Sequence, residues 1–354
     1  MRNGPMPALA ALLLLLPGLA SCGTSAASST SHFGADSSSV LASETIRPEN
    51  IFERVAFLSS DELAGRDTPS EGLETAAAYL VSEYEAMGLE PAGERGTFYQ
   101  RYPFLVRRIG GGSVVEEEAF PPNVAAVVRG SDPQLRNEYV VLSAHFDHVG
   151  IGVPVNGDSI YNGADDNGTG TAALLEVAQT FARLPEPPRR SILFLHVSGE
   201  EHGLLGSEWF SDNPTVPLDR IVANINVDMI GRNSPDSIVV IGQAYSSLGE
   251  VVHRANRENP ALGLTVSDDP WPRERFFFRS DHYNFARKGI PAVFFFAGVH
   301  EDYHRPSDHV EKIDTDKVAR VTRLIFHTVE SIANSAQRPR WDPAGLAEVR
   351  RLTR

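Results

Sequence analysis

The stretch Tyr139-Val-Val-Leu-Ser-Ala-His-Phe-Asp-His-Val-Gly150 joins an uncharged apolar run to a cluster of polar side chains. Residues 139–144 carry no charge, which is typical of a strand buried in a sheet. Side chains two positions apart share one face of an extended backbone, so we expect His145 and Asp147 to point the same way. An imidazole oriented by a carboxylate is typical of a metal ligand. A strand that ends in a solvated polar turn would carry the same residues, so the choice between a metal site and a simple turn depends on the other motifs.

Predicted strands and helices alternate along most of the chain. Ser70 is a good N-cap for one helix, and Gly88 is a good stop for it. Residues 110–118, with three glycines and an acidic run, indicate a solvated connection. The alternation predicts an α/β fold in three layers, with helices on both faces of a mixed, mostly parallel central sheet. We expect strands at 97–106, 123–129, 138–144, 191–197, 220–227, 237–242 and 291–296, and helices at 47–60, 71–87, 169–183, 204–210, 246–258 and 314–334.

Acidic and histidine residues follow four of the predicted strands. His145 ends one strand, residues 198–203 follow the next, Asp228 follows a third, and residues 301–308 come after the last. Ligands of open α/β sheets bind beyond the carboxyl ends of the strands, so these groups should converge near Asp165. Clustered carboxylates repel one another, and their convergence therefore calls for bound cations.

Five motifs, in this order, resemble the M28 family of zinc aminopeptidases: HFDH (145–148), GADDNGTG (163–170), SGEEHG (198–203), NVDMIGR (226–232) and YHRPSD (303–308). The segments 58–66, 280–282 and 289–294 also match the style of that family, and the resemblance covers about residues 50–334. Many relatives insert a protease-associated domain before the first metal motif. Here only about twenty residues separate Phe104 from Asn123, too few for an independent domain.

The resemblance implies a site with two zinc ions and five ligands: His145 and Asp228 for the first ion, Glu201 and His304 for the second, and Asp165 as the bridge. It also implies a cis peptide after Asp165. Imidazole and carboxylate ligands around a shared bridge suit zinc.

The resemblance further implies three catalytic roles in a zinc-dependent exopeptidase that releases N-terminal amino acids from peptides. Glu200 would be the base that activates the attacking water, Asp147 would orient His145, and Tyr303 would help to stabilise the oxyanion. Three alternatives remain open: a carboxypeptidase or dipeptidase on the same scaffold, a glutaminyl cyclase that works with one zinc ion, and a binding protein without catalysis.

The composition narrows the class of partner. A chain of 354 residues with 42% hydrophobic and 22% charged residues is an ordinary globular protein. The net charge of −14 argues against nucleic acid as a partner and against adsorption to anionic lipid. The resemblance to the M28 family implies that the partners are peptide substrates.

The N-terminus is expected to be a targeting segment. Residues 8–16 form a short apolar run after Arg2, and Leu19-Ala-Ser-Cys22 resembles the lipobox of bacterial lipoproteins. We expect a lipoprotein signal peptide over 1–21, acylation of Cys22, a flexible tether over 22–44, a peptidase domain over 45–337 and a basic tail over 338–354. The protein would then be anchored in the cell envelope by lipid, on the extracytoplasmic side of a bacterial membrane.

Other patterns allow competing interpretations. The spacing of Asp165 to Glu176 partly matches a calcium-binding EF-hand loop, but no amphipathic helix enters it. The segment 268–278, with Trp271 and three successive phenylalanines, could line a substrate pocket or pack in the hydrophobic core. Arginines 273, 275 and 279 beside it could meet a substrate carboxylate. Other histidines near the motifs, at 148, 202, 282, 300 and 309, are expected to support the site or face solvent, and His196 to lie in the core.

Overall fold

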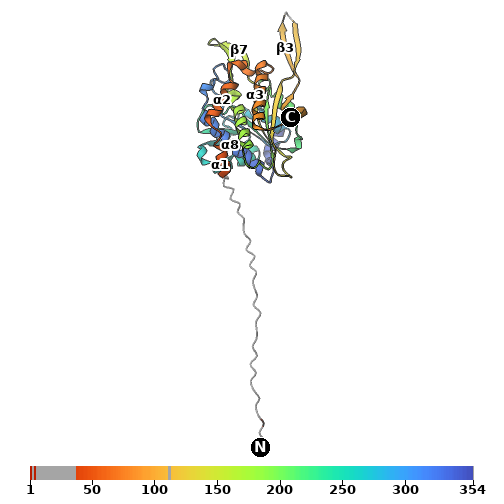
Figure 1. The fold of residues 1–354 in the computed structure, drawn as a ribbon, viewed down its shortest axis with the longest axis vertical. Coiled ribbons are helices and arrows are strands. Elements are labelled where there is room, and N and C mark those ends of the chain that lie inside the picture. Colours follow the sequence, from red (N-terminus) through yellow and green to blue (C-terminus); the bar gives the residue numbers. More distant parts are fainter. Residues whose placement is uncertain (2–3, 5–36, 111–112, 354) are drawn as a thin grey trace. The chain divides into compact units, whose positions relative to one another are not determined.

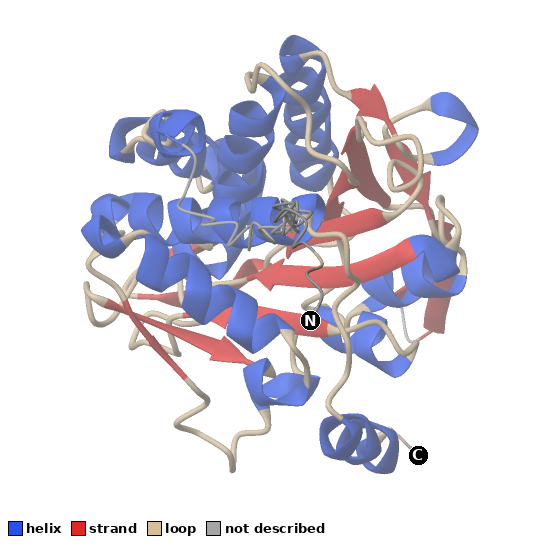
Figure 2. Cartoon of the chain, turned by 90° about the horizontal axis from the view of Figure 1, so that it is seen from below, coloured by secondary structure: helices blue, strands red, loops and turns tan. Residues whose placement is uncertain are grey.

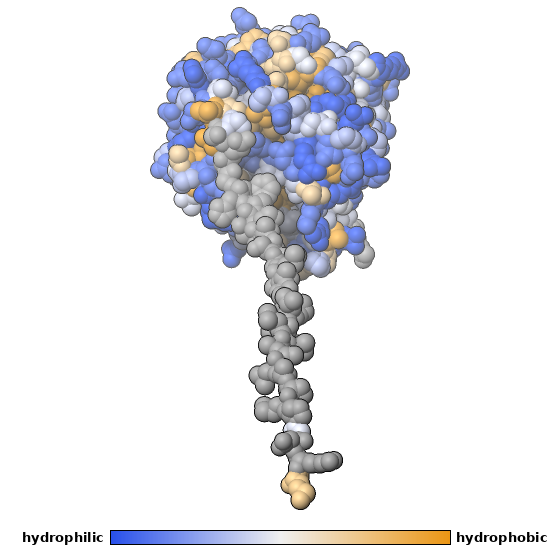
Figure 3. Space-filling model, turned by 60° about the horizontal axis from the view of Figure 1, so that its bottom comes forward, coloured by the Kyte–Doolittle hydropathy of each residue, from blue (hydrophilic) through white to orange (hydrophobic). Residues whose placement is uncertain are grey.

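A computed structural model describes Met1, Gly4 and residues 37–110 and 113–353, and the described residues from 37 onward belong to one compact unit. Cys22 and the predicted signal peptide lie outside the described residues, apart from Met1 and Gly4. None of the helices in the described part of the chain is both long and apolar enough to cross a bilayer. The face of the folded unit in Figure 3 carries mostly hydrophilic residues with scattered apolar ones.

The described residues place nine strands in one central sheet. Four adjacent strands at its centre, in the order β9-β6-β10-β13, are parallel. The pairs β5–β9 and β11–β13 on either side are antiparallel, so the sheet is mixed and its parallel part is the middle. In sequence order the strands are β1 Glu90–Pro91, β2 Tyr99–Arg101, β5 Pro122–Val128, β6 Tyr139–His145, β9 Ser191–Val197, β10 Ile221–Val227, β11 Ser237–Ile241, β12 Thr265–Ser267 and β13 Ala292–Phe296.

Helices cover both faces of this sheet (Figure 2). Along β6, alternate residues enter different cores. Val140 and Leu142 lie in the core that the longer helices cover, whereas Val141 lies in the core on the opposite face of the sheet. This confirms the predicted three layers. On the first face lie α2 Pro48–Leu58, α3 Glu71–Met87, α4 Gly170–Ala182, α6 Leu248–Glu258 and α8 Thr315–Asn334, and on the second α5 Leu205–Asp212, α7 His282–Arg287 and α9 Pro343–Leu352.

Short helical turns connect these elements. Two of them border the site described below, η3 Ala164–Thr169 and η7 Phe276–Phe278. The others are η1 Asp61–Arg66, η2 Glu94–Gly96, η4 Leu218–Arg220, η5 Gln243–Tyr245, η6 Pro260–Leu262 and η8 Val310–Lys312.

Two hairpins, β3 Phe104–Gly110 with β4 Ser113–Ala119 and β7 Gly150–Val155 with β8 Asp158–Tyr161, form separate two-stranded sheets near the top of Figure 1. The acidic run 116–118 is exposed to solvent as predicted, but it lies in strand β4 and not in a loop. Arg107 and Glu116 face each other in the antiparallel pair, with Arg107 Nε 3.0 Å from Glu116 Oε1.

Both ends of the predicted peptidase domain differ from the structure. The expected tether over 22–44 contains helix α1 (Ser37–Ser43), whose Ser39 hydroxyl donates to Glu330 of α8 at 2.5 Å. The expected tail over 338–354 contains α9, which packs on the body through the fully buried Val349. The folded unit therefore extends beyond 45–337 on both sides.

Candidate active site

Four strand ends meet at one edge of the sheet. β6 ends at His145, the loop after β9 carries Glu200 and Glu201, and Asp228 follows β10. The loop after β13 brings His304 to the same place. The parallel centre of the sheet explains this convergence, because parallel strands present their carboxyl ends together.

His145 is the centre of a first cluster. Its Nε2 lies 3.3 Å from Asp228 Oδ1 and 3.3 Å from Asp166 Oδ1. On the other side of the ring, Nδ1 lies 3.6 Å from Asp147 Oδ1, as the strand alternation predicted. The Asp147 carboxylate is itself fixed, since Oδ2 accepts hydrogen bonds from the Gly199 amide at 2.8 Å and from the Thr68 hydroxyl at 3.1 Å.

Glu201 is the centre of a second cluster. Its Oε2 lies 3.0 Å from His304 Nε2, and its Oε1 lies 2.8 Å from His148 Nδ1. Asp166 Oδ2 also lies 3.1 Å from His304 Nε2. His304 has a φ of 53°, a left-handed conformation uncommon for a residue with a side chain and often associated with functional positions.

Asp166, and not Asp165, lies between the two clusters. Its carboxylate is only 4% exposed and faces His145 with one oxygen and His304 with the other. Asp165 points away: its Oδ1 accepts from the Gly231 amide at 2.7 Å, and its Oδ2 lies 3.3 Å from His300. The assignment of the bridge to Asp165 was therefore wrong.

The turn after Gly163 explains this shift by one residue. Gly163 has a φ of 60°, and Asp308 Oδ2 accepts the amide hydrogens of both Asp165 and Asp166, at 2.9 and 3.2 Å. These contacts rotate the second carboxylate of the pair into the site. The cis peptide is likewise one residue further along than expected, between Asp166 and Asn167.

Glu200 and Tyr303 line a small cavity of about 30 Å³ together with His145, Asp166 and Asp228. The Tyr303 ring stacks on the His304 ring with centroids 3.9 Å apart. The structure therefore places the expected base and the expected hydroxyl donor beside the two clusters.

The electrostatics of the site are those of an acidic cavity. Burial raises the pKa of Glu200 well above its usual range; His145 opposes this rise and Glu201 adds to it. Burial alone would lower the pKa of His304, but Asp166 and Glu201 raise it to about 10. Carboxylates outnumber basic groups in this space, so the residues present form a donor set that suits divalent cations such as zinc.

Two residues that sequence reasoning undervalued support the site. His148 is fully buried against Glu201, so it could join the second cluster, and it is the last residue of the HFDH motif. Arg66, also buried, donates to the carbonyl oxygens of Phe146, at 2.9 Å, and Gly163, at 3.0 Å. It thereby connects the segments that carry the first two motifs. Its place at the end of segment 58–66, which matches the style of the family, was the available signal.

The structure also bears on the expectations for His196, the calcium loop and the phenylalanine-rich segment. His196 lies in the core as predicted, with Nε2 2.6 Å from the Tyr84 hydroxyl. The calcium-loop alternative fails, because Glu176 lies within α4 and pairs with Arg54 at 2.8 Å. The phenylalanine-rich segment contributes to both the cavity and the core, since Phe276 lines the cavity and Phe277 packs in the core.

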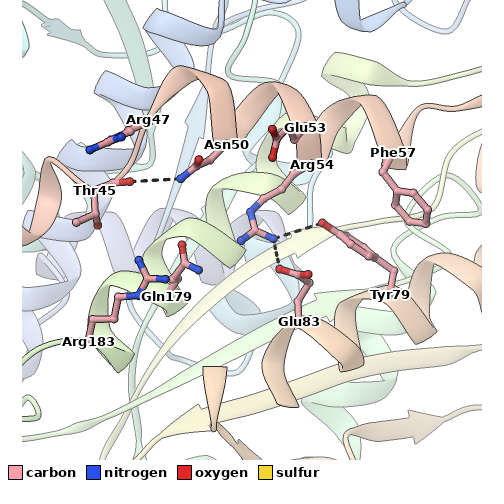
Figure 4. Close-up of a pocket in the computed structure, with 10 residues that line it drawn as sticks. All are labelled: Thr45, Arg47, Asn50, Glu53, Arg54, Phe57, Tyr79, Glu83, Gln179 and Arg183. Atoms are coloured by element: carbon pink, nitrogen blue, oxygen red, sulfur yellow. Dashed lines mark hydrogen bonds and ion pairs between the residues drawn. The ribbon is translucent and has the colours of Figure 1, made fainter. Parts of the chain in front are cut away.

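A larger cavity of about 630 Å³ lies elsewhere, between α2, α3 and the end of α4 (Figure 4). Arg54 in its wall is already paired with Glu83 and hydrogen-bonded to Tyr79. No histidine lines it among the described residues, so it offers nothing comparable to the two clusters.

Comparisons with known proteins agree with this geometry. The chain is 25% identical over 335 residues to a probable zinc metalloprotease of Pyrenophora teres f. teres, covering 82% of this chain and 66% of that protein. It is 26% identical over 216 residues to aminopeptidase YwaD of Bacillus subtilis, covering 57% of this chain and 43% of that protein. The match thus covers less than two thirds of the length of each of these relatives.

The fold is also that of a solved aminopeptidase from Aneurinibacillus sp. strain AM-1, with a TM-score of 0.64 and 16% identity over 84% of this chain and 97% of that one. The model of peptidase family M28 matches residues 123–329, more than half of the chain and all five motifs. The protein therefore belongs to peptidase family M28.

Proposed function

We propose that the protein is a zinc-dependent exopeptidase that removes amino acids from the amino end of peptides. The observation that carries this proposal is the sharing of Asp166 by two imidazole–carboxylate clusters, with Glu200 in the same cavity. Membership of family M28 and the similarity to a probable zinc metalloprotease support zinc as the metal.

Two ions would be held by the side chains of the clusters. His145 and Asp228 would bind the first, Glu201 and His304 the second, and Asp166 both. Such a pair of ions would supply Lewis acidity and lower the pKa of a bound water. His148 is close enough to Glu201 either to orient it or to take part in the second set.

Three side chains would carry out proton transfer, stabilisation of the oxyanion and orientation of a metal ligand. Glu200 would accept the proton of the attacking water and pass it to the leaving amine, since it lies in the cavity without being needed as a ligand. Tyr303 would donate its hydroxyl hydrogen to the carbonyl oxygen as negative charge develops there. Asp147 would hold the His145 ring in orientation.

The charge of the cavity favours the amino end of a peptide. Pairing a buried ammonium with carboxylates is favourable, whereas burying it unpaired is costly. We therefore expect peptides with a free amine to be cleaved and N-acetylated peptides to lose at least ~10²-fold in kcat/KM, the scale of a few kcal/mol. Kinetics on one peptide, with each end blocked in turn, test this.

The end-blocking kinetics, together with a peptide that begins with glutamine, separate the alternatives. Loss of cleavage on C-terminal amidation, with no effect of acetylation, would indicate a carboxypeptidase. Cyclisation of an N-terminal glutamine without peptide hydrolysis would indicate a glutaminyl cyclase.

We also propose that the mature protein is anchored in the cell envelope through acylated Cys22. The support is the sequence alone, namely the apolar run over 8–16 followed by Leu19-Ala-Ser-Cys22.

A further inference from the structure

Arg279 lies beside the proposed active site, directly after η7. It lines the small cavity that contains His145 and Glu200, and also an adjoining pocket of about 370 Å³ whose wall includes Trp271 and Tyr303. Among the described residues, Arg279 is the only lysine or arginine that lines either space.

The guanidinium of Arg279 is oriented but weakly neutralised. Its Cζ lies 4.8 Å from the centroid of the Phe276 ring, a stacking contact that orients the group. Its Nη1 lies 3.8 Å from Glu274 Oε2, and these side chains are 44% and 60% exposed, so this ion pair contributes little. Within the described part of the chain the guanidinium makes no hydrogen bond, and its planar set of N–H donors is free for a ligand.

The wall of the pocket beside Arg279 is mainly aromatic, and among the described residues its one acidic member is Glu274, which is 60% exposed. The rings of Trp271, Phe276 and Phe296 form one cluster, with centroids 4.9 to 5.9 Å apart. Among these rings, Phe276 holds the guanidinium in orientation. Because the Arg279 side chain is 44% exposed, its N–H donors are accessible to an incoming carboxylate, with which they can form charge-assisted hydrogen bonds.

From this geometry we infer that Arg279 binds a carboxylate of the peptide substrate, close to the bond that is cleaved. The inference rests on the proposed peptidase function. A fork of N–H donors matches the two oxygens of a carboxylate. The carboxylate has two sources in peptides of this size: the side chain of an acidic first residue, or the free carboxyl end of a dipeptide.

Two pairs of substrates distinguish these sources. The first pair is a tripeptide amide that begins with glutamate or with glutamine, and the second is leucyl-alanine with a free or an amidated carboxyl end. Each is assayed with the wild type, Arg279→Gln and Arg279→Lys. Arg275→Gln is the matched control, since the Arg275 guanidinium stacks on Phe278 at 4.9 Å in the same way but lines neither space.

We expect Arg279→Gln to lower kcat/KM about 10- to 100-fold for the carboxylate member of one pair, the range for loss of a charge-assisted contact. The neutral member should change by less than about threefold, and Arg279→Lys should recover part of the loss. The affected pair identifies the source. Equal losses for both members of each pair, no loss for any, or the same selective loss in Arg275→Gln would overturn the inference. If the wild-type protein hydrolyses none of the four peptides, the proposed function fails, and this inference with it.

Discussion

Exchange of Asp166 for asparagine should remove the shared side chain of the two clusters while preserving its shape. The carboxylate lies 3.3 Å from His145 Nε2 and 3.1 Å from His304 Nε2, so both proposed metal positions would lose a charged ligand at once. Replacing residues that only support ligands costs about 10- to 100-fold in metal affinity. We therefore expect at least ~100-fold weaker binding of each ion, or about 2.7 kcal/mol. Peptide hydrolysis should fall with the metal content.

Asp165→Asn is the matched control, one residue away and equally buried. Its carboxylate accepts from the Gly231 amide at 2.7 Å and from the Thr169 hydroxyl at 3.1 Å, so the variant weakens two charge-assisted hydrogen bonds. We expect about 1–3 kcal/mol less stability, with both metal ions retained. Zinc content after dialysis against a series of chelators measures metal affinity, and urea unfolding measures stability. If Asp165→Asn loses zinc while Asp166→Asn keeps it, the placement of the two carboxylates is incorrect.

Three further predictions concern other residues. Glu200→Gln should keep both ions and lose about 10²–10⁴-fold in kcat, whereas Glu201→Gln should weaken metal binding; the reverse pattern would exchange their roles. Burial lowers the pKa of His196 to about 3, so the protonation of this residue in the unfolded chain should destabilise the fold as pH falls below 6.5. Between pH 7 and pH 5 the free energy of unfolding should fall by about 2 kcal/mol more in the wild type than in His196→Gln. Urea unfolding at several pH values measures this, and an equal dependence on pH in both proteins would contradict it. Cys22→Ser should release the protein from the membrane fraction or leave it as precursor, and fractionation identical to wild type would refute the lipid anchor.

Helix boundaries were predictable where local hydrogen-bond chemistry marks them. Helix α3 runs over Glu71–Met87 as expected, because the Ser70 hydroxyl accepts from the Leu73 amide at 3.0 Å and Gly88 adopts a φ of 74°. Such signals act within a few residues and do not depend on the rest of the fold.

The choice between Asp165 and Asp166 could not be made from local pattern. Residues 164–169 form an irregular turn, so neither strand alternation nor helical spacing says which carboxylate faces the cavity. The answer depends on Asp308, which lies more than 140 positions away in the chain and accepts both amide hydrogens.

The C-terminal helix was missed for a related reason. Residues 338–354 are basic, a composition typical of a loose end, and the local signal for a helix, the capping Asp342 followed by Pro343, is short. The helix is stabilised by contacts with distant parts of the chain, among them the buried Val349 and the Trp341 Nε1 hydrogen bond to the Gly289 carbonyl oxygen at 2.8 Å. Tertiary packing of this kind overrides composition.

The zinc content of the purified wild-type protein tests the central claim most directly. Protein prepared without chelator and measured by elemental analysis should contain two zinc ions per folded chain, because two clusters share Asp166. Peptide hydrolysis should disappear on chelation and return as the second ion binds. A content that stays near one ion per chain with excess zinc, or activity that survives complete removal of metal, would contradict the account.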